Sequence, residues 1–105
     1  MRFVDVCALE SVAPGNGRAV RVGRHDVALF SVGGNVYAIE NSCRHAGTAL
    51  SQGPLCGHIV ACPSHGWKYD VRTGDLVAAP GLSVRRYPVR IVDGRVLVGI
   101  GDYAA

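Results

Sequence analysis

The sequence lacks any long apolar run, and this absence excludes a membrane-spanning helix. Its 105 residues contain no stretch of the roughly 20 consecutive apolar residues that a bilayer requires. The first residues, MRFVDVCALE, also lack the apolar stretch of a secretory signal. We therefore expect a cytoplasmic protein with no membrane partner, and its length predicts a single domain over residues 1–105.

Charge is also scarce. Charged residues make up 18% of the chain, and 11 basic against 8 acidic residues leave a formal net charge of +3. An apolar content of 49% at so low a charge excludes a disordered chain. The arginines do not cluster with aromatic residues, and no G-x-G-x-x-G pattern or phosphate-binding loop is present. We expect no nucleic-acid partner.

No apolar pattern at helical spacing appears either. The 14 glycines and 5 prolines interrupt the chain often. Apolar residues instead alternate around tight-turn signals at 33–35 (GGN) and 93–94 (DG). The inward face of the second hairpin is expected to comprise Tyr87, Val89, Ile91, Val96, Val98 and Ile100. We expect an all-β fold, an antiparallel β-sandwich or small barrel.

A glycine-rich segment interrupts the strand pattern between residues 42 and 81. Apolar alternation weakens there, and glycines follow one another closely: Gly47, Gly53, Gly57, Gly66, Gly74 and Gly81. The two places where a cysteine and a histidine stand together both lie in this segment. We therefore expect a cluster-binding subdomain over about 42–81, inserted in a β base formed by residues 1–41 and 82–105.

The four cysteines do not suggest a disulfide framework. Thiols stay reduced in the cytosol, which is where we place this chain. Cys43 and Cys62 each stand beside a histidine, whereas Cys7 and Cys56 do not. We expect the first pair to bind metal, Cys7 to be a buried free thiol, and Cys56 to be a free thiol near a turn.

The spacing of the candidate ligands is C-x-H-x16-C-x-x-H, with His45 and His65 as its two histidines. Two thiolates and two imidazoles satisfy a tetrahedral Zn²⁺, so a structural zinc site is one interpretation. Common zinc sites, however, take two cysteines from one loop and two histidines from another. One of each from both loops suits two irons bridged by two sulfides, with the cysteines on one iron and the histidines on the other. We favour this [2Fe–2S] interpretation over zinc.

These two stretches resemble the ligand loops of the Rieske iron–sulfur proteins. The matching residues are Cys43, His45, Gly47 and Leu50 in CRHAGTAL, and Cys62, Pro63, His65, Gly66 and Trp67 in CPSHGW. The resemblance continues through YDVRTG, Pro80 and the YPVRIVDGRVLV hairpin, so it covers nearly the whole chain. It implies the Rieske fold and one [2Fe–2S] cluster. Cys43 and Cys62 would hold the inner iron, and His45 and His65 the outer, solvent-facing iron.

The resemblance also implies a range for the reduction potential. Rieske centres lie at about −150 to +300 mV, against about −400 mV for plant-type ferredoxins. The respiratory branch of the family adds a disulfide between the loops and a serine that donates to a bridging sulfide. Here Thr48 and Ser64 stand at the disulfide positions and Trp67 replaces the serine, so we expect the lower half of the range. Tyr69 matches a tyrosine of that branch whose hydroxyl donates to a cysteine sulfur.

Four further residues have simpler expected roles. His25, in GRHD, is expected to be a solvated turn residue, and His58 to lie on the surface near a hairpin tip. Trp67 and Pro80 are expected to shield the cluster from water.

The resemblance implies an electron carrier that is not an enzyme by itself. Oxygenase large subunits of the family add a domain with a mononuclear iron, and no D-x-x-H-x-x-x-x-H pattern for that iron is present. The expected function is transfer of single electrons from a flavin-dependent NAD(P)H reductase to a terminal oxygenase, such as an aromatic ring-hydroxylating dioxygenase. The alternatives are the small Rieske subunit of an assimilatory nitrite reductase and a zinc-stabilised interaction domain.

We also expect a monomer that meets its partners at the cluster end. Arg44, Lys68 and Arg72 are the only basic residues of segment 42–81. They are expected to steer an acidic partner surface towards the cluster.

Overall fold

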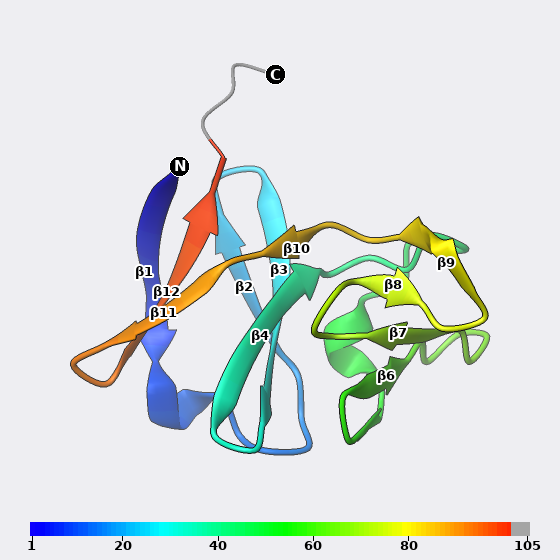
Figure 1. Cartoon of the computed structure of the whole chain (residues 1–105), viewed down its shortest axis with the longest axis horizontal. Helices are drawn as coiled ribbons and strands as arrows, with labels where there is room; N and C mark the ends of the chain where they lie inside the picture. Colours follow the sequence, from blue (N-terminus) through cyan, green and yellow to red (C-terminus); the bar gives the residue numbers. More distant parts are fainter. Residues whose placement is uncertain (102–105) are drawn as a thin grey trace.

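The computed structural model describes residues 1–101 and confirms the predicted all-β antiparallel fold (Figure 1). Its strands are β1 (Arg2–Ala8), β2 (Arg18–Val22), β3 (His25–Val32), β4 (Asn35–Glu40), β5 (Leu55–Cys56), β6 (Ile59–Ala61), β7 (Lys68–Asp70), β8 (Asp75–Leu76), β9 (Ala79–Ser83), β10 (Arg86–Tyr87), β11 (Val89–Val92) and β12 (Arg95–Ile100). Two short 3-10 turns, η1 (Leu9–Ser11) and η2 (Leu50–Gln52), are the only helical elements in this range. Over the same residues, no helix has the length and apolar character needed to cross a bilayer.

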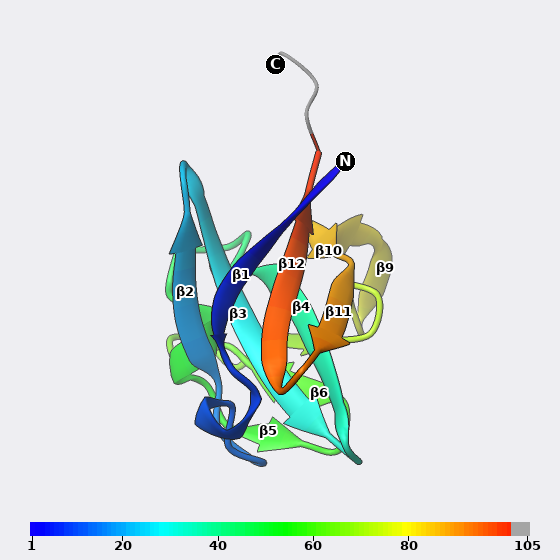
Figure 2. The ribbon, with the colours of Figure 1, turned by 90° about the vertical axis from the view of Figure 1, so that its left-hand side faces the viewer.

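The strands form three antiparallel sheets. A three-stranded sheet has the order β1-β12-β11, a four-stranded sheet the order β10-β4-β3-β2, and a five-stranded sheet the order β5-β6-β7-β8-β9. Figures 1 and 2 show the four-stranded sheet between the other two. Residues 55–83 therefore form a sheet of their own at one end of the molecule.

Glycine-containing turns set two of the hairpins, as the sequence predicts. Gly33 and Gly34 connect β3 to β4 with φ of 58° and 84°, and Asp93 and Gly94 connect β11 to β12 with φ of 50° and 74°. Two successive left-handed residues give a turn whose twist matches that of the flanking strands. Both turn predictions are confirmed.

The middle sheet lies between two apolar cores, and its strand β3 shows this residue by residue. Val27 and Leu29 pack into one apolar core, whereas Ala28 and Phe30 pack into another. Successive side chains of a strand point to opposite faces, so a strand covered on both sides is apolar throughout. The first core, the base core, lies between the middle sheet and the three-stranded sheet and comprises Cys7, Val12, Val27, Leu29, Val36, Ala38, Tyr87, Val96, Val98 and Ile100.

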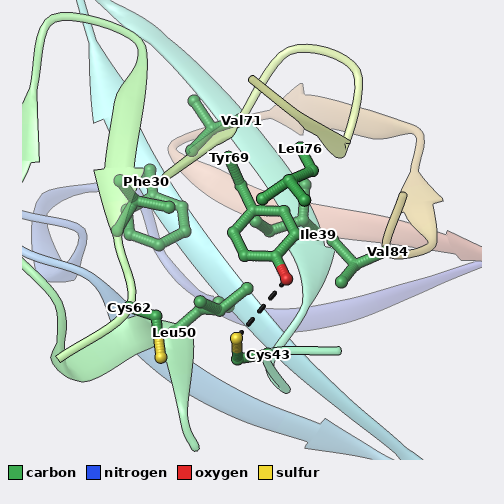
Figure 3. Close-up of a cluster of buried hydrophobic side chains, with 11 residues drawn as sticks. Phe30, Ile39, Cys43, Leu50, Cys62, Tyr69, Val71, Leu76 and Val84 are labelled. Carbon is green, nitrogen blue, oxygen red and sulfur yellow. Dashed lines mark hydrogen bonds between the residues drawn. The ribbon is translucent and has the colours of Figure 1, made fainter. Parts of the chain in front are cut away.

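The second core, the site core, lies on the other face of the middle sheet (Figure 3). Its members are Ala28, Phe30, Ile39, Cys43, Leu50, Cys62, Val60, Tyr69, Val71, Leu76 and Val84. Both cysteines that stand beside histidines thus belong to an apolar core to which the middle sheet, the five-stranded sheet and their loops all contribute.

The prediction of the inward face of the last hairpin is wrong at Ile91. Val96 and Val98 are fully buried and Tyr87 is 6% exposed, but Ile91 is 43% exposed. Ile91 pairs with Val96 in register, yet Val96 lies in the central strand β12 and Ile91 in the edge strand β11. An edge strand has a neighbouring strand on one side only, so its side chains are less covered than those of a central strand. Alternation of apolar residues alone therefore does not predict that Ile91 is buried.

Candidate metal centre

The two cysteine–histidine stretches form loops with the same backbone hydrogen bonds. Cys43 follows β4, and Cys62 follows β6 directly. In the first loop, the N–H of Gly47 donates to the carbonyl of Cys43 at 2.8 Å, and the N–H of Cys43 donates to the carbonyl of Thr48 at 2.9 Å. In the second loop, the N–H of Gly66 donates to Cys62 at 2.9 Å, and the N–H of Cys62 donates to Trp67 at 2.7 Å.

Each loop depends on a glycine four residues after its cysteine. Gly47 has φ of 68° and Gly66 has φ of 75°, in the left-handed region that L side chains rarely adopt. Gly47 and Gly66 were predicted only as glycines of the 42–81 segment and as matches to the family loops, but both stand at the same C-x-x-x-G spacing. It is the signal for two equivalent turns that present their cysteines to a common site.

The two loops bury their cysteines and expose their histidines. Cys43 and Cys62 are each 2% exposed, whereas His45 and His65 are exposed. Figure 3 shows both sulfur atoms at one edge of the site core. The imidazole rings of His45 and His65 meet edge to face, with centroids 4.4 Å apart. The structure thus brings all four predicted site residues together, with the sulfurs inside and the imidazoles at the surface.

Tyr69 contacts the buried sulfur of the first loop. Its hydroxyl oxygen lies 3.4 Å from Sγ of Cys43 and accepts the backbone N–H of Arg44 at 3.1 Å. Because the hydroxyl accepts from Arg44, its own proton is free to donate to the sulfur. This is the contact that the resemblance implied for Tyr69.

The surroundings of Cys43 favour its thiolate. Burial raises the pKa of the Cys43 thiol, but hydrogen bonds from the Tyr69 hydroxyl, the backbone N–H of His45, the Cys62 side chain and the backbone N–H of Ala46 together lower it further than burial raises it. Burial and the hydrogen bond to Cys43 raise the pKa of Tyr69 to about 12, so this hydroxyl keeps its proton at neutral pH. Metal ligation requires a thiolate, and these hydrogen-bond donors stabilise the thiolate form of Cys43.

The donor set fits a two-iron cluster. Within residues 1–101, no three His, Cys, Asp or Glu side chains lie close enough to hold one metal ion together. The four predicted donors are two buried cysteines and two exposed histidines whose rings meet edge to face. Two irons bridged by sulfides need two protein ligands each, and two thiolates with two imidazoles can supply them.

Two further residues support the loops of the site: Trp67 contacts His45, and Asn41 anchors the start of the first loop. The ring of Trp67 packs on His45 with centroids 4.7 Å apart, and Trp67 also packs against the site core. Asn41, which the sequence analysis missed, is 5% exposed. Its Oδ1 accepts the N–H of Ser51 at 2.7 Å and its Nδ2 donates to Asp26 at 3.3 Å, so it joins the start of the first loop to η2. An asparagine just after a strand gave no specific signal.

The remaining histidines lie in different surroundings. His58 lies in the turn between β5 and β6, as expected, but it is half-buried and packs on Tyr37 with ring centroids 5.5 Å apart. The expectation of a solvated turn is wrong for His25, which begins β3, is half-buried, and has its Nδ1 3.1 Å from the hydroxyl of Tyr87. Tyr87 is 62 residues away in the chain, so the local sequence could not indicate this contact.

The other cysteines and the basic residues are also placed. Cys7 is buried in β1, as expected, and Cys56 is exposed at the end of β5. Arg72 forms an ion pair with Asp70 at 2.8 Å, and Arg44 donates from Nη1 to the carbonyl of Ser83 at 3.2 Å.

Taken together, the fold and the site define a small β-sheet redox protein with a mixed cysteine–histidine cluster site. The chain belongs to the Rieske [2Fe–2S] domain family, whose model matches residues 2–88. The cofactor of this family is a Rieske-type [2Fe–2S] cluster, which agrees with the donor set.

Similar proteins cover nearly the whole chain. The naphthalene 1,2-dioxygenase system ferredoxin component of Pseudomonas putida is 33% identical over 101 residues, which are 95% of this chain and 97% of that protein. A chain in the solved complex of reduced oxygenase and oxidized ferredoxin in carbazole 1,9a-dioxygenase is 36% identical, with a TM-score of 0.83 over 91% of this chain and all of that chain. A nitrite reductase small subunit from Mycobacterium tuberculosis is 28% identical, with a TM-score of 0.85 over 92% and 93% of the two chains.

Proposed function

We propose that this protein is a Rieske-type ferredoxin that carries single electrons to a terminal oxygenase and does no catalysis by itself. The observation that carries the proposal is the site itself: two buried cysteines and two exposed histidines on matched loops, in a chain whose relatives are ferredoxin components of dioxygenase systems along their full length. When bound, the cluster supplies one reversible electron.

The four site residues have distinct roles in this proposal. Cys43 and Cys62 hold the inner iron as thiolates, in a site that is closed to water. His45 and His65 hold the outer iron and form the edge through which electrons enter and leave, because their rings are the exposed part of the site. Residues 42–81 act as the cluster-binding subdomain, and residues 1–41 and 82–105 as its β base.

The partners follow from the carrier role. A flavin-dependent NAD(P)H reductase supplies the electron, and the acceptor is a terminal oxygenase, of the ring-hydroxylating dioxygenase class named for several relatives. The protein acts in the cytoplasm as a monomer, with no nucleic-acid or membrane partner. A carrier that serves two partners in turn needs small, short-lived interfaces.

Reconstitution tests the proposal directly. The purified protein is combined with a reductase and a terminal oxygenase encoded near it in the genome, and NAD(P)H-dependent product formation is followed with and without it. We expect turnover only in the complete mixture, and none with the reductase and the ferredoxin alone.

A second candidate function rests on the similarity to the nitrite reductase small subunit. The same purified protein is added to the large subunit of an assimilatory nitrite reductase. Activity restored there, and with no oxygenase, would replace the proposed function by this one. Stoichiometric zinc without iron in the purified protein would instead support the zinc-stabilised interaction domain.

A further inference from the structure

An apolar groove lies beside the second ligand loop. It has a volume of about 480 Å³ and lies between the end of that loop and the β8–β9 hairpin. Its lining residues are Gly66, Trp67, Lys68, Leu76, Val77, Ala78, Ala79 and Leu82. Only Lys68 among them carries a charge.

The groove is bordered by a hairpin turn of unusual composition. Leu76 pairs with Ala79, so the two residues of the tight turn between β8 and β9 are Val77 and Ala78. Turns of this length favour glycine, asparagine and aspartate, and a β-branched apolar residue gains nothing from water there. An exposed turn residue that departs from these preferences is typical of a functional surface.

Exposed large apolar side chains occur at few places in residues 1–101. Besides Met1 they are Val77 (50% exposed) and Leu82 (43%) in the groove, and Ile91 (43%) and Val92 (47%) near the β11–β12 turn. Figure 1 shows the β8–β9 hairpin and the β11–β12 turn at opposite ends of the molecule. Neighbouring exposed apolar residues in a hollow are a common mark of a binding site.

The groove is continuous with the histidine edge through Trp67. The indole of Trp67 lines the groove and packs on the ring of His45. A side chain inserted into the groove therefore touches a residue that itself touches a proposed ligand of the outer iron. A partner seated there lies next to the exposed histidines, where electron transfer has to occur.

We propose that this groove binds an apolar side chain that projects from the surface of the terminal oxygenase, with an oxygenase carboxylate next to it that pairs with Lys68. The inference rests on the proposed function and adds the site and chemistry of the contact. Val77 and Leu82 supply the desolvated part of the interface. Lys68 is the cation at the rim, and it acts mainly on the association rate.

Paired aspartate substitutions test the groove. Val77→Asp and Leu82→Asp place a charge in it, whereas Val92→Asp and Ile91→Asp place the same charge on side chains of similar exposure at the far end. All four variants change the net charge equally, so the effect of net charge alone cancels in the comparison. The probe is the oxidised form of the terminal oxygenase that accepts electrons from the wild-type protein. Isothermal titration gives the Kd, and stopped-flow absorbance gives the transfer rate.

We expect Val77→Asp and Leu82→Asp to raise the Kd about tenfold or more, as for residues at the centre of an interface. The two control variants should stay within about twofold of the wild type. All variants should keep the wild-type visible spectrum, because none of these four side chains belongs to the ligand loops. Lys68→Glu should slow association at low salt, and the difference should disappear as salt screens the charge.

The outcomes separate this inference from the proposed function. If wild-type protein reduces an oxygenase and all four aspartate variants bind it equally well, the groove is not the contact and the carrier function stands. If the groove variants instead slow only reduction by the reductase, the groove belongs to the donor and the inference is wrong. If wild-type protein reduces no oxygenase, the proposed function fails and this inference fails with it.

Discussion

At the scale of single residues, the hydroxyl of Tyr69 shows how a side chain tunes a buried sulfur. It accepts from the N–H of Arg44 and donates to Cys43, and the contact with Cys43 is buried within the site core. Reduction of the cluster increases the negative charge on its sulfur ligands. A donor to sulfur therefore stabilises the reduced state more than the oxidised state and raises the reduction potential.

Replacing Tyr69 by phenylalanine should lower the reduction potential. The lost hydrogen bond is worth about 1 kcal/mol, which corresponds to roughly 40 mV for one electron. The measurement is a spectroelectrochemical titration of both proteins. Tyr37→Phe is the matched control, because Tyr37 also packs against the site core and its ring contacts His58. Equal potentials for the wild type and Tyr69→Phe would show that the hydroxyl does not act on the sulfur in the loaded protein.

At the scale of structural elements, the two ligand loops are the same turn used twice. In each, a left-handed glycine closes the turn and returns its N–H to the cysteine carbonyl. The histidine stands two residues after Cys43 but three residues after Cys62. The two loops thus share the same backbone turn but carry their histidines at different positions. They face each other across the site, and their imidazole rings are in contact.

Gly66→Ala should destabilise the protein and disturb the cluster together. The left-handed conformation costs an alanine about 1 kcal/mol or slightly more, which lowers the Tm by several degrees in a chain of this size. The loop can avoid this strain only by turning away from the geometry that presents Cys62. We expect a lower Tm and a lower iron content per chain, measured by differential scanning calorimetry and iron analysis.

Gly57→Ala is the matched control for this strain. Gly57 also has a left-handed φ of 59°, and an added Cβ would meet nothing within 4 Å at either glycine. Gly57 lies in the β5–β6 turn, outside the ligand loops. The Gly57→Ala variant should show the same decrease in Tm but keep its iron. If Gly66→Ala loses no more iron than Gly57→Ala, the second loop does not need its left-handed turn to hold the cluster.

The elements that the sequence predicted are those with local signals. The hairpins were predicted from the turn signals at 33–34 and 93–94 and from the alternation of apolar residues. The site was predicted from the unusual pairing of cysteine with histidine. The sequence did not predict what depends on distant partners. Ile91 alternates like a buried residue, but its strand is at an edge. Gly53 looks like one loop glycine among many, yet a Cβ added there would collide with the carbonyl oxygen of Ala61 in β6.

At the scale of the whole molecule, the two cores divide the protein into parts with different dependence on the cluster. The site core contains Cys43 and Cys62, whereas the base core contains neither. A ligand that binds only the folded state stabilises that state, and a metal centre does so for the part of the chain that carries its ligands.

Removing the cluster should therefore loosen one end of the protein more than the other. We expect amides of β6 and β7 to lose much of their protection from hydrogen exchange in the apoprotein. Amides of β1 and β12, which pack on the base core, should keep most of theirs. The measurement is hydrogen exchange by mass spectrometry on the loaded and iron-free protein. A uniform loss of protection would mean that the two cores unfold as one unit.

The mixed ligation by Cys43, His45, Cys62 and His65 is the central claim, and the midpoint reduction potential tests it most directly. Spectroelectrochemical titration of the purified protein should show a one-electron transition in the lower half of about −150 to +300 mV, the range of clusters with two histidine ligands. A midpoint near −400 mV, the value of all-cysteine plant-type ferredoxins, would contradict the ligand assignment. A protein with no visible redox transition at all would contradict the cluster itself.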